Sequence, residues 1–375
     1  MKPLPIKDKE TFSRFTQFLQ EQKAKKQGLL LIHDADGDGI SSAKILQAGL
    51  KQLGIKAKYH FAAFDRNKLF GDFLLKFIEQ RKIAAIFTTD LNLLATNYVQ
   101  QKEALKGKTF IVFDHHELQQ NLDKNVLYFH PALTYGFEDP SQYCTTKLVY
   151  DIMSEFADLT ELDWVASIGL VADSTYRTWK DFVDNTTQKL GLPIPKNPFD
   201  SELQKVGSLL AYGLAMDKES AEKAIKTYFT AKSYTEAGKG LQQFEIVGDE
   251  IQHYVKHWSD FAEKHDDVIF IKIESQYKIN SLVSSRISVE HPHTTIIVGS
   301  PNRSTEEKEE KFFSFSLRRQ DKNVNLPKLL KEIATQLPGC LGGGHIPAAG
   351  AKCRLEDYEK FKALFLKLQG KYTEK

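Results

Sequence analysis

The stretch "LLLIHDADGDGISS", residues 29–42, joins an apolar run to an unusual cluster of charge. Four apolar residues are followed by His33 and then by three alternating aspartates, Asp34, Asp36 and Asp38. Three ionised carboxylates this close together repel one another at neutral pH. A divalent cation would offset the repulsion, because the carboxylates would then become its ligands. The stretch therefore indicates a metal site at the end of a buried strand.

Two simpler interpretations of these carboxylates are a polar turn and a calcium-binding loop. A calcium loop requires a glutamate at its twelfth position. Counted from Asp34, that position is Ile45, so the calcium loop is excluded. Gly37 and Gly39 let the backbone turn tightly around the acids. A simple polar turn remains an alternative for this stretch taken alone, and further acids and histidines along the chain bear on it.

Short apolar strands alternate with helices through the first half of the chain. We expect strands at residues 29–32, 57–62, 82–90 and 108–116. We expect helices at 8–26, at 163–175, and from Ser41 or Ser42 as the cap to a stop at Gly54. This alternation is typical of an α/β fold with a doubly wound, mostly parallel sheet covered on both faces. In such sheets, sites form beyond the carboxyl ends of the strands.

The second half of the chain predicts a smaller α/β domain behind a helical connector. A proline-punctuated stretch within 177–205 cannot continue a helix, so the first domain is expected to end there. The predicted divisions are 1–190, a connector at 191–265, and 266–375. Within the last division we expect strands at 268–275, 293–300 and 311–319, and helices at 326–337 and at the C-terminus. The charge-rich segment "PNRSTEEKEEK", 301–311, is predicted to be a solvated hairpin loop.

Composition and charge limit the kinds of protein this can be. The 375 residues are 41% hydrophobic and 27% charged, with a net charge of +2, which is ordinary for a soluble globular chain of two domains. So small a charge gives no overall attraction to nucleic acid or membrane. The three cysteines, Cys144, Cys340 and Cys353, lack CxxC spacing and fit a reducing cytoplasm. We find no signal peptide and no apolar run of about 18 residues, so no transmembrane helix is expected.

Carboxylates and imidazoles also follow other apolar segments. Asp90 ends the strand at 82–90, Asp114, His115 and His116 end the strand at 108–116, and Asp173 ends the helix at 163–175. A lone aspartate could cap a helix, but two adjacent histidines at a strand end rarely serve packing. Oxygen and nitrogen ligands of this kind favour Mn²⁺ or Mg²⁺. Their number exceeds what one octahedral ion takes, so we expect two ions ~3.5–4 Å apart, as in hydrolysis at phosphorus.

The motifs and their order resemble the DHH phosphoesterases over nearly the whole chain. The namesake motif stands as "VFDHHEL", around Asp114. The family's first, second and fourth motifs resemble "HDADGDGISS", "TTDLN" and "GLVADST". The C-terminal half is similar to the family's associated substrate-binding domain, whose glycine motif stands as "GGGHIPAAGA", Gly342 to Ala351, after the strand "FSFSLRR".

The resemblance implies a role for each matching residue. The implied metal ligands are His33, Asp36, Asp38, Asp90, His115 and Asp173. Asp90 would bridge both ions. His116 would lie beside the phosphate as a hydrogen-bond donor or acid to the leaving oxygen, and Asp114 would orient the histidines.

The first motif offers two registers. RecJ-like members read D-x-D-x-D-G, which matches Asp34, Asp36, Asp38 and Gly39 without a gap. Oligoribonuclease and pyrophosphatase members carry a histidine first, which matches His33 at closer spacing. We favour His33 as the ligand because it ends the strand, and we keep Asp34 as its substitute.

The C-terminal motif predicts a phosphate or nucleotide contact. Consecutive glycines let the backbone approach a ligand and point N–H groups at a phosphate, which suggests Gly343 and Gly344. His345 would add a donor. The family resemblance implies that Arg318 contacts a phosphate or base in a bidentate mode, with Arg286 as a second candidate. Strand alternation sends Arg318 and its neighbour Arg319 to opposite faces.

The expected function is a Mn²⁺-dependent phosphodiesterase, with Mg²⁺ possible, that hydrolyses single-stranded oligonucleotides from an end. It would be a RecJ-like exonuclease or an oligoribonuclease, holding the strand end in a cleft between two domains. One alternative is a phosphoesterase for cyclic or linear dinucleotides or small nucleotides. Another is a non-catalytic nucleic-acid-binding subunit, which is disfavoured because every expected ligand is present. A homodimer stays open, and no membrane partner is expected.

Overall fold

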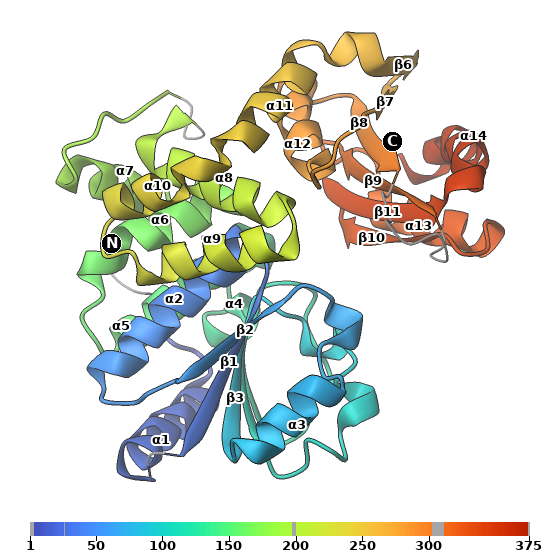
Figure 1. Ribbon diagram of the computed structural model, residues 1–375. Helices are drawn as coiled ribbons and strands as arrows, with labels where there is room; N and C mark the ends of the chain where they lie inside the picture. Colours follow the sequence, from blue (N-terminus) through green and yellow to red (C-terminus); the bar gives the residue numbers. More distant parts are fainter. Residues whose placement is uncertain (1–3, 26, 197–199, 302–310, 374–375) are drawn as a thin grey trace. The chain divides into compact units, whose positions relative to one another are not determined.

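The computed structural model describes residues 4–25, 27–196, 200–301 and 311–373. The chain forms two compact units, residues 1–214 with 219–243, and residues 215–218 with 244–375. Each unit contains one β-sheet with helices packed on it (Figure 1). The predicted α/β fold class is confirmed. The hairpin loop predicted for 301–311 lies, apart from its two end residues, outside the described residues.

The sheet of the first unit is entirely parallel and has the order β2-β1-β3-β4-β5. Its strands are β1 (Gly28–Asp34), β2 (Tyr59–Ala63), β3 (Ile83–Thr89), β4 (Thr109–Phe113) and β5 (Val126–Phe129). The central strands are almost wholly buried because both of their faces are covered, and they are mostly apolar up to the polar residues at their carboxyl ends. Leu30 and Ile32 pack with Phe70 and Leu74 on one face. On the other face Phe87 contacts Phe18.

Helices lie on both sides of this sheet, with α3 on one side and α1, α2 and α5 on the other (Figure 1). Their bounds are α1 (Lys9–Lys25), α2 (Gly37–Gln52), α3 (Asp72–Gln80), α4 (Pro131–Thr134), α5 (Thr145–Ser154), α6 (Asp163–Ala172) and α7 (Lys180–Lys189). The predicted start of α2 at Ser41 or Ser42 was wrong. Asp36 caps the helix instead, because its Oδ1 accepts a hydrogen bond from the Gly39 amide at 2.8 Å.

The predicted connector, 191–265, is shared between the two units. Its helices α8 (Glu202–Ala215), α9 (Lys218–Thr230) and α10 (Tyr234–Leu241) fall mostly in the first unit, and α11 (Glu245–Lys256) falls in the second. Lys44 of α2 shows why α9 belongs with the first sheet. Its buried ammonium donates to the carbonyls of Tyr228 at 2.6 Å and Ala231 at 2.5 Å, at the C-terminal end of α9.

The second unit has a mixed six-stranded sheet of order β10-β11-β9-β8-β7-β6. Its strands are β6 (Ala262–His265), β7 (Val268–Lys272), β8 (Thr295–Pro301), β9 (Phe312–Arg318), β10 (Leu341–His345) and β11 (Ala348–Arg354). Its helices are α12 (Asn280–Glu290), α13 (Leu326–Gln336) and α14 (Tyr358–Leu368). Phe315 and Phe361 stack at 4.2 Å within its hydrophobic core. Among the described residues, no helix is long and apolar enough to cross a membrane.

Candidate metal centre

The strand ends of the first sheet bring the predicted residues to one edge. His33 pairs with Thr89, and Thr89 pairs with Phe113. The next residue along each strand is therefore an acid: Asp34, Asp90 or Asp114. The Asp90 amide donates to the Phe113 carbonyl at 2.9 Å, so the parallel pairing continues to the acids. A parallel sheet places its functional groups at this carboxyl edge.

The backbone turns sharply at two of the acids. Asp90 has φ +62°, a left-handed conformation that is uncommon for a residue with a side chain. Ser174, which directly follows Asp173, has φ +59°. Such conformations cost roughly 1–3 kcal/mol and cluster at functional sites, where the surrounding structure holds them. Both left-handed residues thus lie at, or directly after, an aspartate of the acid cluster.

Three overlapping groups of ligand atoms form the candidate centre. Within each group the nitrogen and carboxylate oxygen atoms lie within 4.8 Å of one another. The groups are Asp90 with His115 and His116, Asp38 with His115 and Asp173, and Asp34 with Asp36 and Asp90. His115 Nε2 lies 3.6 Å from Asp90 Oδ1, 3.7 Å from Asp173 Oδ2 and 3.9 Å from Asp38 Oδ2. His115 and Asp90 each belong to two groups, so the centre is continuous.

Three carboxylates of this centre, those of Asp36, Asp90 and Asp173, hold protons more tightly than ordinary aspartates. Burial, followed by the charges of Asp34 and Asp38, raises the pKa of Asp36 to about 7. Burial and then neighbouring carboxylates raise the pKa values of Asp90 and Asp173 well above the usual range. Asp36 itself is exposed to solvent, so repulsion explains its shift better than burial does. Carboxylates that destabilise one another fit a divalent cation, and the O and N donors suit Mn²⁺ or Mg²⁺.

The N-terminus of α5 holds Asp38 in place. The backbone amides of Thr145 and Thr146 donate to its two carboxylate oxygens at 2.8 and 2.7 Å. Free amides at a helix N-terminus favour a negative charge. The Thr145 hydroxyl also donates to Asp90 Oδ1 at 3.1 Å. Thr145 therefore fixes two acids from different segments, a role that the sequence pattern did not assign to it.

Asp114 orients His116. Its Oδ1 lies 2.7 Å from His116 Nδ1, and its Oδ2 accepts a hydrogen bond from Gln119 Nε2 at 3.2 Å. Burial by itself would lower the pKa of His116, but the hydrogen bond and charge of Asp114 raise it overall. Burial would likewise raise the pKa of Asp114, and its bond to His116 lowers it. His130 Nε2 lies 3.0 Å from the His116 carbonyl, so it supports the turn behind the motif.

His33 lies outside the three groups. Its Nδ1 lies 2.7 Å from the Asp34 carbonyl oxygen, and its ring stacks near Phe229 with centroids 5.6 Å apart. Burial lowers its pKa to about 4, and its Nε2 has no hydrogen-bond partner among the described residues. Asp34, the substitute ligand of the sequence analysis, is the residue that joins Asp36 and Asp90. The role predicted for His33 stays a prediction.

Arg66 is a site residue that sequence reasoning missed. It lies in a short 3₁₀ helix, Arg66–Lys68, after β2. Its Nε donates to Asp34 Oδ1 at 3.1 Å, and its Nη2 donates to Asp34 Oδ2. Asp90 and Asp36 also contribute to the raised pKa of Arg66, so the guanidinium lies within the field of the centre. The surrounding sequence, "DRNK", carries no local motif that would have singled it out.

The second unit aligns the predicted substrate residues on neighbouring strands. In register, His345 of β10 pairs with Ala348 of β11, which pairs with Arg318 of β9. Gly343 pairs with Gly350. A Cβ atom at Gly343 would meet no described residue within 4 Å, so that part of the structure leaves the backbone there open to an approaching ligand.

Gly344 has a different constraint. Its φ is +137°, and a Cβ atom would lie 2.5 Å from the Ala348 carbonyl oxygen. Only glycine therefore fits where β10 turns toward His345, whose side chain is exposed. The sequence analysis valued this glycine for its approach to a ligand, but the close contact shown here is with β11.

The two arginines after the "FSFSL" strand point away from each other, as alternation predicts. Arg318 donates to the hydroxyls of Ser285 at 3.0 Å and Ser316 at 3.2 Å, and burial lowers its pKa to about 10. Arg319 pairs with Asp267 at 2.7 Å and has a structural role. Arg286 lies in α12, one residue after the Ser285 that holds Arg318.

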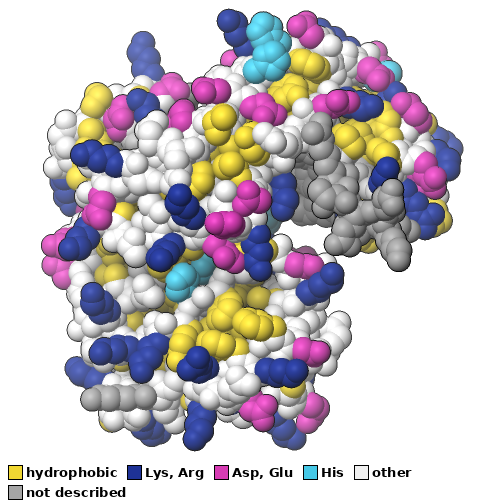
Figure 2. Space-filling view, viewed as in Figure 1, with side chains coloured by type: hydrophobic (Ala, Val, Ile, Leu, Met, Phe, Trp, Pro, Cys, Tyr) yellow, Lys and Arg dark blue, Asp and Glu magenta, His cyan; other side chains and the backbone are white. Residues whose placement is uncertain are grey.

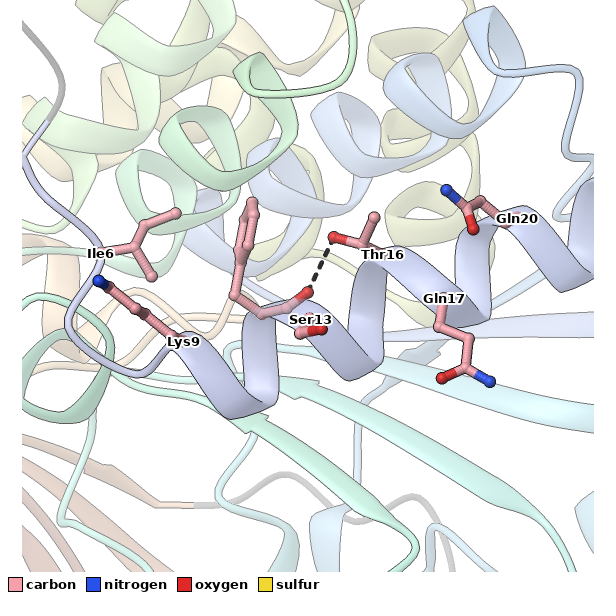
Figure 3. Close-up of a pocket in the computed structure, with 7 residues that line it drawn as sticks. Ile6, Lys9, Ser13, Thr16, Gln17 and Gln20 are labelled. Atoms are coloured by element: carbon pink, nitrogen blue, oxygen red, sulfur yellow. Dashed lines mark hydrogen bonds between the residues drawn. The ribbon is translucent and has the colours of Figure 1, made fainter.

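An open groove of about 650 Å³ runs along α1 and takes no part in this centre. Figure 3 shows its lining residues, which are mostly uncharged polar side chains of one helix. The Thr16 hydroxyl donates back to the Phe12 carbonyl at 2.9 Å, as serine and threonine hydroxyls do within helices. None of its lining residues belongs to the three ligand groups.

Comparison with known proteins gives two family matches. The model of the DHH family N-terminal domain matches residues 29–171, and that of the DHHA1 domain matches residues 279–371. Together they cover more than half of the chain. The first match contains the motifs around Asp36, Asp90 and His115, and it ends two residues before Asp173. The second contains Arg318 and His345. No curated protein is significantly similar to the chain in sequence.

Solved structures share the fold. RecJ from Thermus thermophilus, in complex with Mn²⁺, has a TM-score of 0.69 at 17% identity, covering 100% of this chain and 56% of RecJ. This chain thus spans about half the length of that relative. An exonuclease RecJ bound to manganese has a TM-score of 0.66 at 18% identity and covers 99% and 97%. The DHH domain of a member of a ribosomal protein family has a TM-score of 0.73 at 13% identity and covers 98% and 92%.

These likenesses extend over both units, and the family matches include the acid and histidine motifs as well as the glycine motif. The predicted family is thereby confirmed. The chain belongs to the DHH family of phosphoesterases and carries a DHHA1 domain in its C-terminal half.

Proposed function

We propose that this chain hydrolyses phosphodiester bonds of single-stranded oligonucleotides from an end, with two Mn²⁺ ions as its cofactor and Mg²⁺ as the substitute. The observation that carries the proposal is the convergence of Asp38, Asp90 and Asp173 on one nitrogen of His115, at 3.6 to 3.9 Å. The structures of RecJ with Mn²⁺ and with Mg²⁺ support the choice of ions.

The ligands we propose are five of the seven residues in the overlapping groups: Asp36, Asp38, Asp90, His115 and Asp173. Bound ions would supply an activated water and stabilise charge on the phosphoryl oxygens. Asp90 belongs to two groups and would contribute an oxygen ligand to each ion. His33, whose predicted role as a ligand is untested, is not among the ligands we propose. We propose that the ion pair of Asp34 and Arg66 balances charge next to these ligands.

His116 is the proton donor in this proposal. The 2.7 Å contact with Asp114 keeps a proton on Nδ1 and, through its charge, favours the doubly protonated ring. A raised pKa keeps a larger fraction of His116 protonated near neutral pH. Its ring can then donate to the oxygen that leaves phosphorus. Asp114 acts by orienting the ring and by stabilising its charge.

We propose that the second unit binds the substrate through Gly343, Gly344, His345, Arg318 and Arg286. The register that aligns His345 with Arg318 supports a shared binding row across β10, β11 and β9. Arg318 contacts neutral hydroxyls in the described structure, and a phosphate would provide the opposite charge that these lack.

One gel tests the proposal. RNA and DNA strands of two to about thirty nucleotides, labelled at either end, are incubated with Mn²⁺ and the parent chain. We expect release of mononucleotides from one end, and none from the double variant Asp114→Ala, His115→Ala. Equal cleavage by the double variant would disprove the assignment of the site. Activity on dinucleotides alone would favour a small-nucleotide phosphoesterase, and binding without any cleavage would identify a nucleic-acid-binding subunit.

A further inference from the structure

We propose that Phe64, with His60 and Phe229, forms a stacking shelf for the nucleobases of the substrate beside the metal centre. The inference rests on the proposed function and names how that function would hold a base. It starts from the edge strand β2, where Ala63 pairs with Asp34. Phe64 is the next residue, and its large apolar side chain is 47% exposed although Ala63 before it is buried.

The backbone fixes Phe64 at the rim of the acid cluster. Its amide donates to the Ala62 carbonyl at 3.1 Å, which closes a tight turn at the end of β2. Two residues later Arg66 returns to Asp34 with two hydrogen bonds. Phe64 is therefore held between the strand partner of Asp34 and its ion-pair partner. These contacts keep the backbone of Phe64 within two residues of both partners of Asp34.

A second aromatic pair, His60 of β2 and Phe229 of α9, lies farther back along β2. The rings of His60 and Phe229 stack with centroids 4.7 Å apart and planes 10° apart, and His60 is exposed. His60 lies four residues before Phe64, or roughly 13 Å along the strand at ~3.3 Å per residue. A hydrophobic patch and an adjacent histidine surface lie over β2 and α3 in the space-filling view (Figure 2).

The charged residues next to Phe64 favour a nucleotide, rather than an apolar protein surface, as the ligand of this side chain. An apolar protein partner that covered Phe64 would also withdraw water from Arg66 and the neighbouring carboxylates, which is unfavourable. A nucleotide carries a flat ring and a phosphate in one molecule. Its ring can stack on Phe64 while its phosphate meets Arg66 and the metal ligands. Stacking of this kind tolerates any base and contributes ~1–3 kcal/mol per base.

The test compares Phe64→Leu with the matched variant Phe73→Leu. Phe73 is a more exposed phenylalanine, 73%, on α3. The same change removes a ring and keeps an apolar side chain in both variants. Each protein is assayed with Mn²⁺ on two substrates, an ordinary oligonucleotide and an abasic strand of the same length, and kcat/KM is measured for both. Melting temperatures are measured to show that both variants fold.

We expect Phe64→Leu to lower the preference for the strand with bases, as a ratio of kcat/KM values, by roughly 5- to 150-fold. The loss should arise in KM. Phe64→Trp should restore the preference, and Phe73→Leu should leave it unchanged. An unchanged ratio for Phe64→Leu would overturn the shelf while leaving the proposed function standing. If the parent cleaves neither strand, the proposed function is wrong. The stacking shelf can then be tested by itself, by measuring the binding of the two strands with fluorescence anisotropy. Equal binding by parent and Phe64→Leu would overturn it.

Discussion

Arg66 holds Asp34 through two guanidinium nitrogens, with Nε 3.1 Å from Oδ1 and Nη2 against Oδ2. Asp34 therefore enters the acid cluster with its charge already paired, whereas Asp36 and Asp90 repel their neighbours and have raised pKa values. The three aspartates of the opening motif are thus not equivalent. Asp34 is an ion-pair partner, Asp36 caps α2, and Asp38 is held by the N-terminus of α5.

Replacement of Arg66 is predicted to make the chain more dependent on metal. Arg66→Gln would leave the Asp34 charge without its partner beside Asp36 and Asp90. We expect the metal-free variant to lose about 1.5 kcal/mol of unfolding free energy, the lower end of the range for a hydrogen bond to a charged group, because the Arg66 side chain is 38% exposed. Mn²⁺ should then stabilise the variant more than the parent. Thermal melts with chelator and with Mn²⁺ measure both effects.

The control for Arg66→Gln is Lys68→Gln. Lys68 pairs with Asp65 three residues earlier, and its side chain is 85% exposed. Because exposed ion pairs contribute little, its melts should match those of the parent. Equal melts for Arg66→Gln and Lys68→Gln, with and without Mn²⁺, would contradict the charge-balancing role.

The affinity for Mn²⁺ is predicted to depend on Asp90 and not on His33. Asp90→Asn should lower Mn²⁺ affinity by at least roughly 10-fold, the scale for weakening a metal site, because Asp90 belongs to two ligand groups. His33→Gln should leave Mn²⁺ affinity nearly unchanged and should lower the melting temperature, because the His33 ring is buried against Phe229. Calorimetric titration with Mn²⁺ gives both affinities. A loss in His33→Gln as large as in Asp90→Asn would restore His33 to the ligand set.

The stability of the metal-free chain is predicted to fall as pH rises. Unfolded aspartates titrate near pH ~3.9, whereas Asp36 in the fold has a pKa of about 7 and those of Asp90 and Asp173 are raised well above the usual range. Between roughly pH 4 and 7 the folded chain thus binds more protons than the unfolded chain, and its stability decreases with pH. We expect a lower melting temperature at about pH 8 than at about pH 5.5 in chelator.

Two comparisons isolate this effect. Asp36→Asn removes one of the titrating groups and should reduce the slope of melting temperature against pH. Saturating Mn²⁺ should reverse the slope, because metal binding displaces the protons and strengthens as pH rises. A melting temperature in chelator that rises steadily over the same pH range would show that the acid cluster is not under repulsive strain.

Gly39 is predicted to be irreplaceable at the start of α2. A Cβ atom there would lie 2.6 Å from the Asp34 carbonyl oxygen and 2.9 Å from the Asp34 Cβ. Both contacts are with backbone or with the base of a side chain, so neither can swing away. Gly39→Ala should cost about 1–3 kcal/mol of unfolding free energy and weaken Mn²⁺ binding.

Gly370→Ala is the control for Gly39→Ala, since a Cβ atom at Gly370 would meet none of the residues that the structure describes within 4 Å. Chemical denaturation of both variants measures the difference. If Gly39→Ala unfolds at the same denaturant concentration as Gly370→Ala, the close approach of α2 to Asp34 is not rigid.

Local sequence patterns predicted the elements that carry the site. The apolar runs before Asp34, Asp90 and Asp114 are buried central strands, and the alternation of strands and helices indicated the parallel sheet. The start of α2 was misplaced because serine and aspartate are both good caps. Spacing alone could not tell which residue would receive the amide of Gly39.

The sequence by itself determined the chemistry available to this protein, because residue type and strand-end position decided which carboxylates and imidazoles would gather at one sheet edge. Only the tertiary structure decided the role of each. The Arg66–Asp34 pair, and the amides of Thr145 and Thr146 on Asp38, join segments 32 to 108 residues apart. Such contacts have no local signature, since they depend on how the loops after β2 and before α5 return to the sheet.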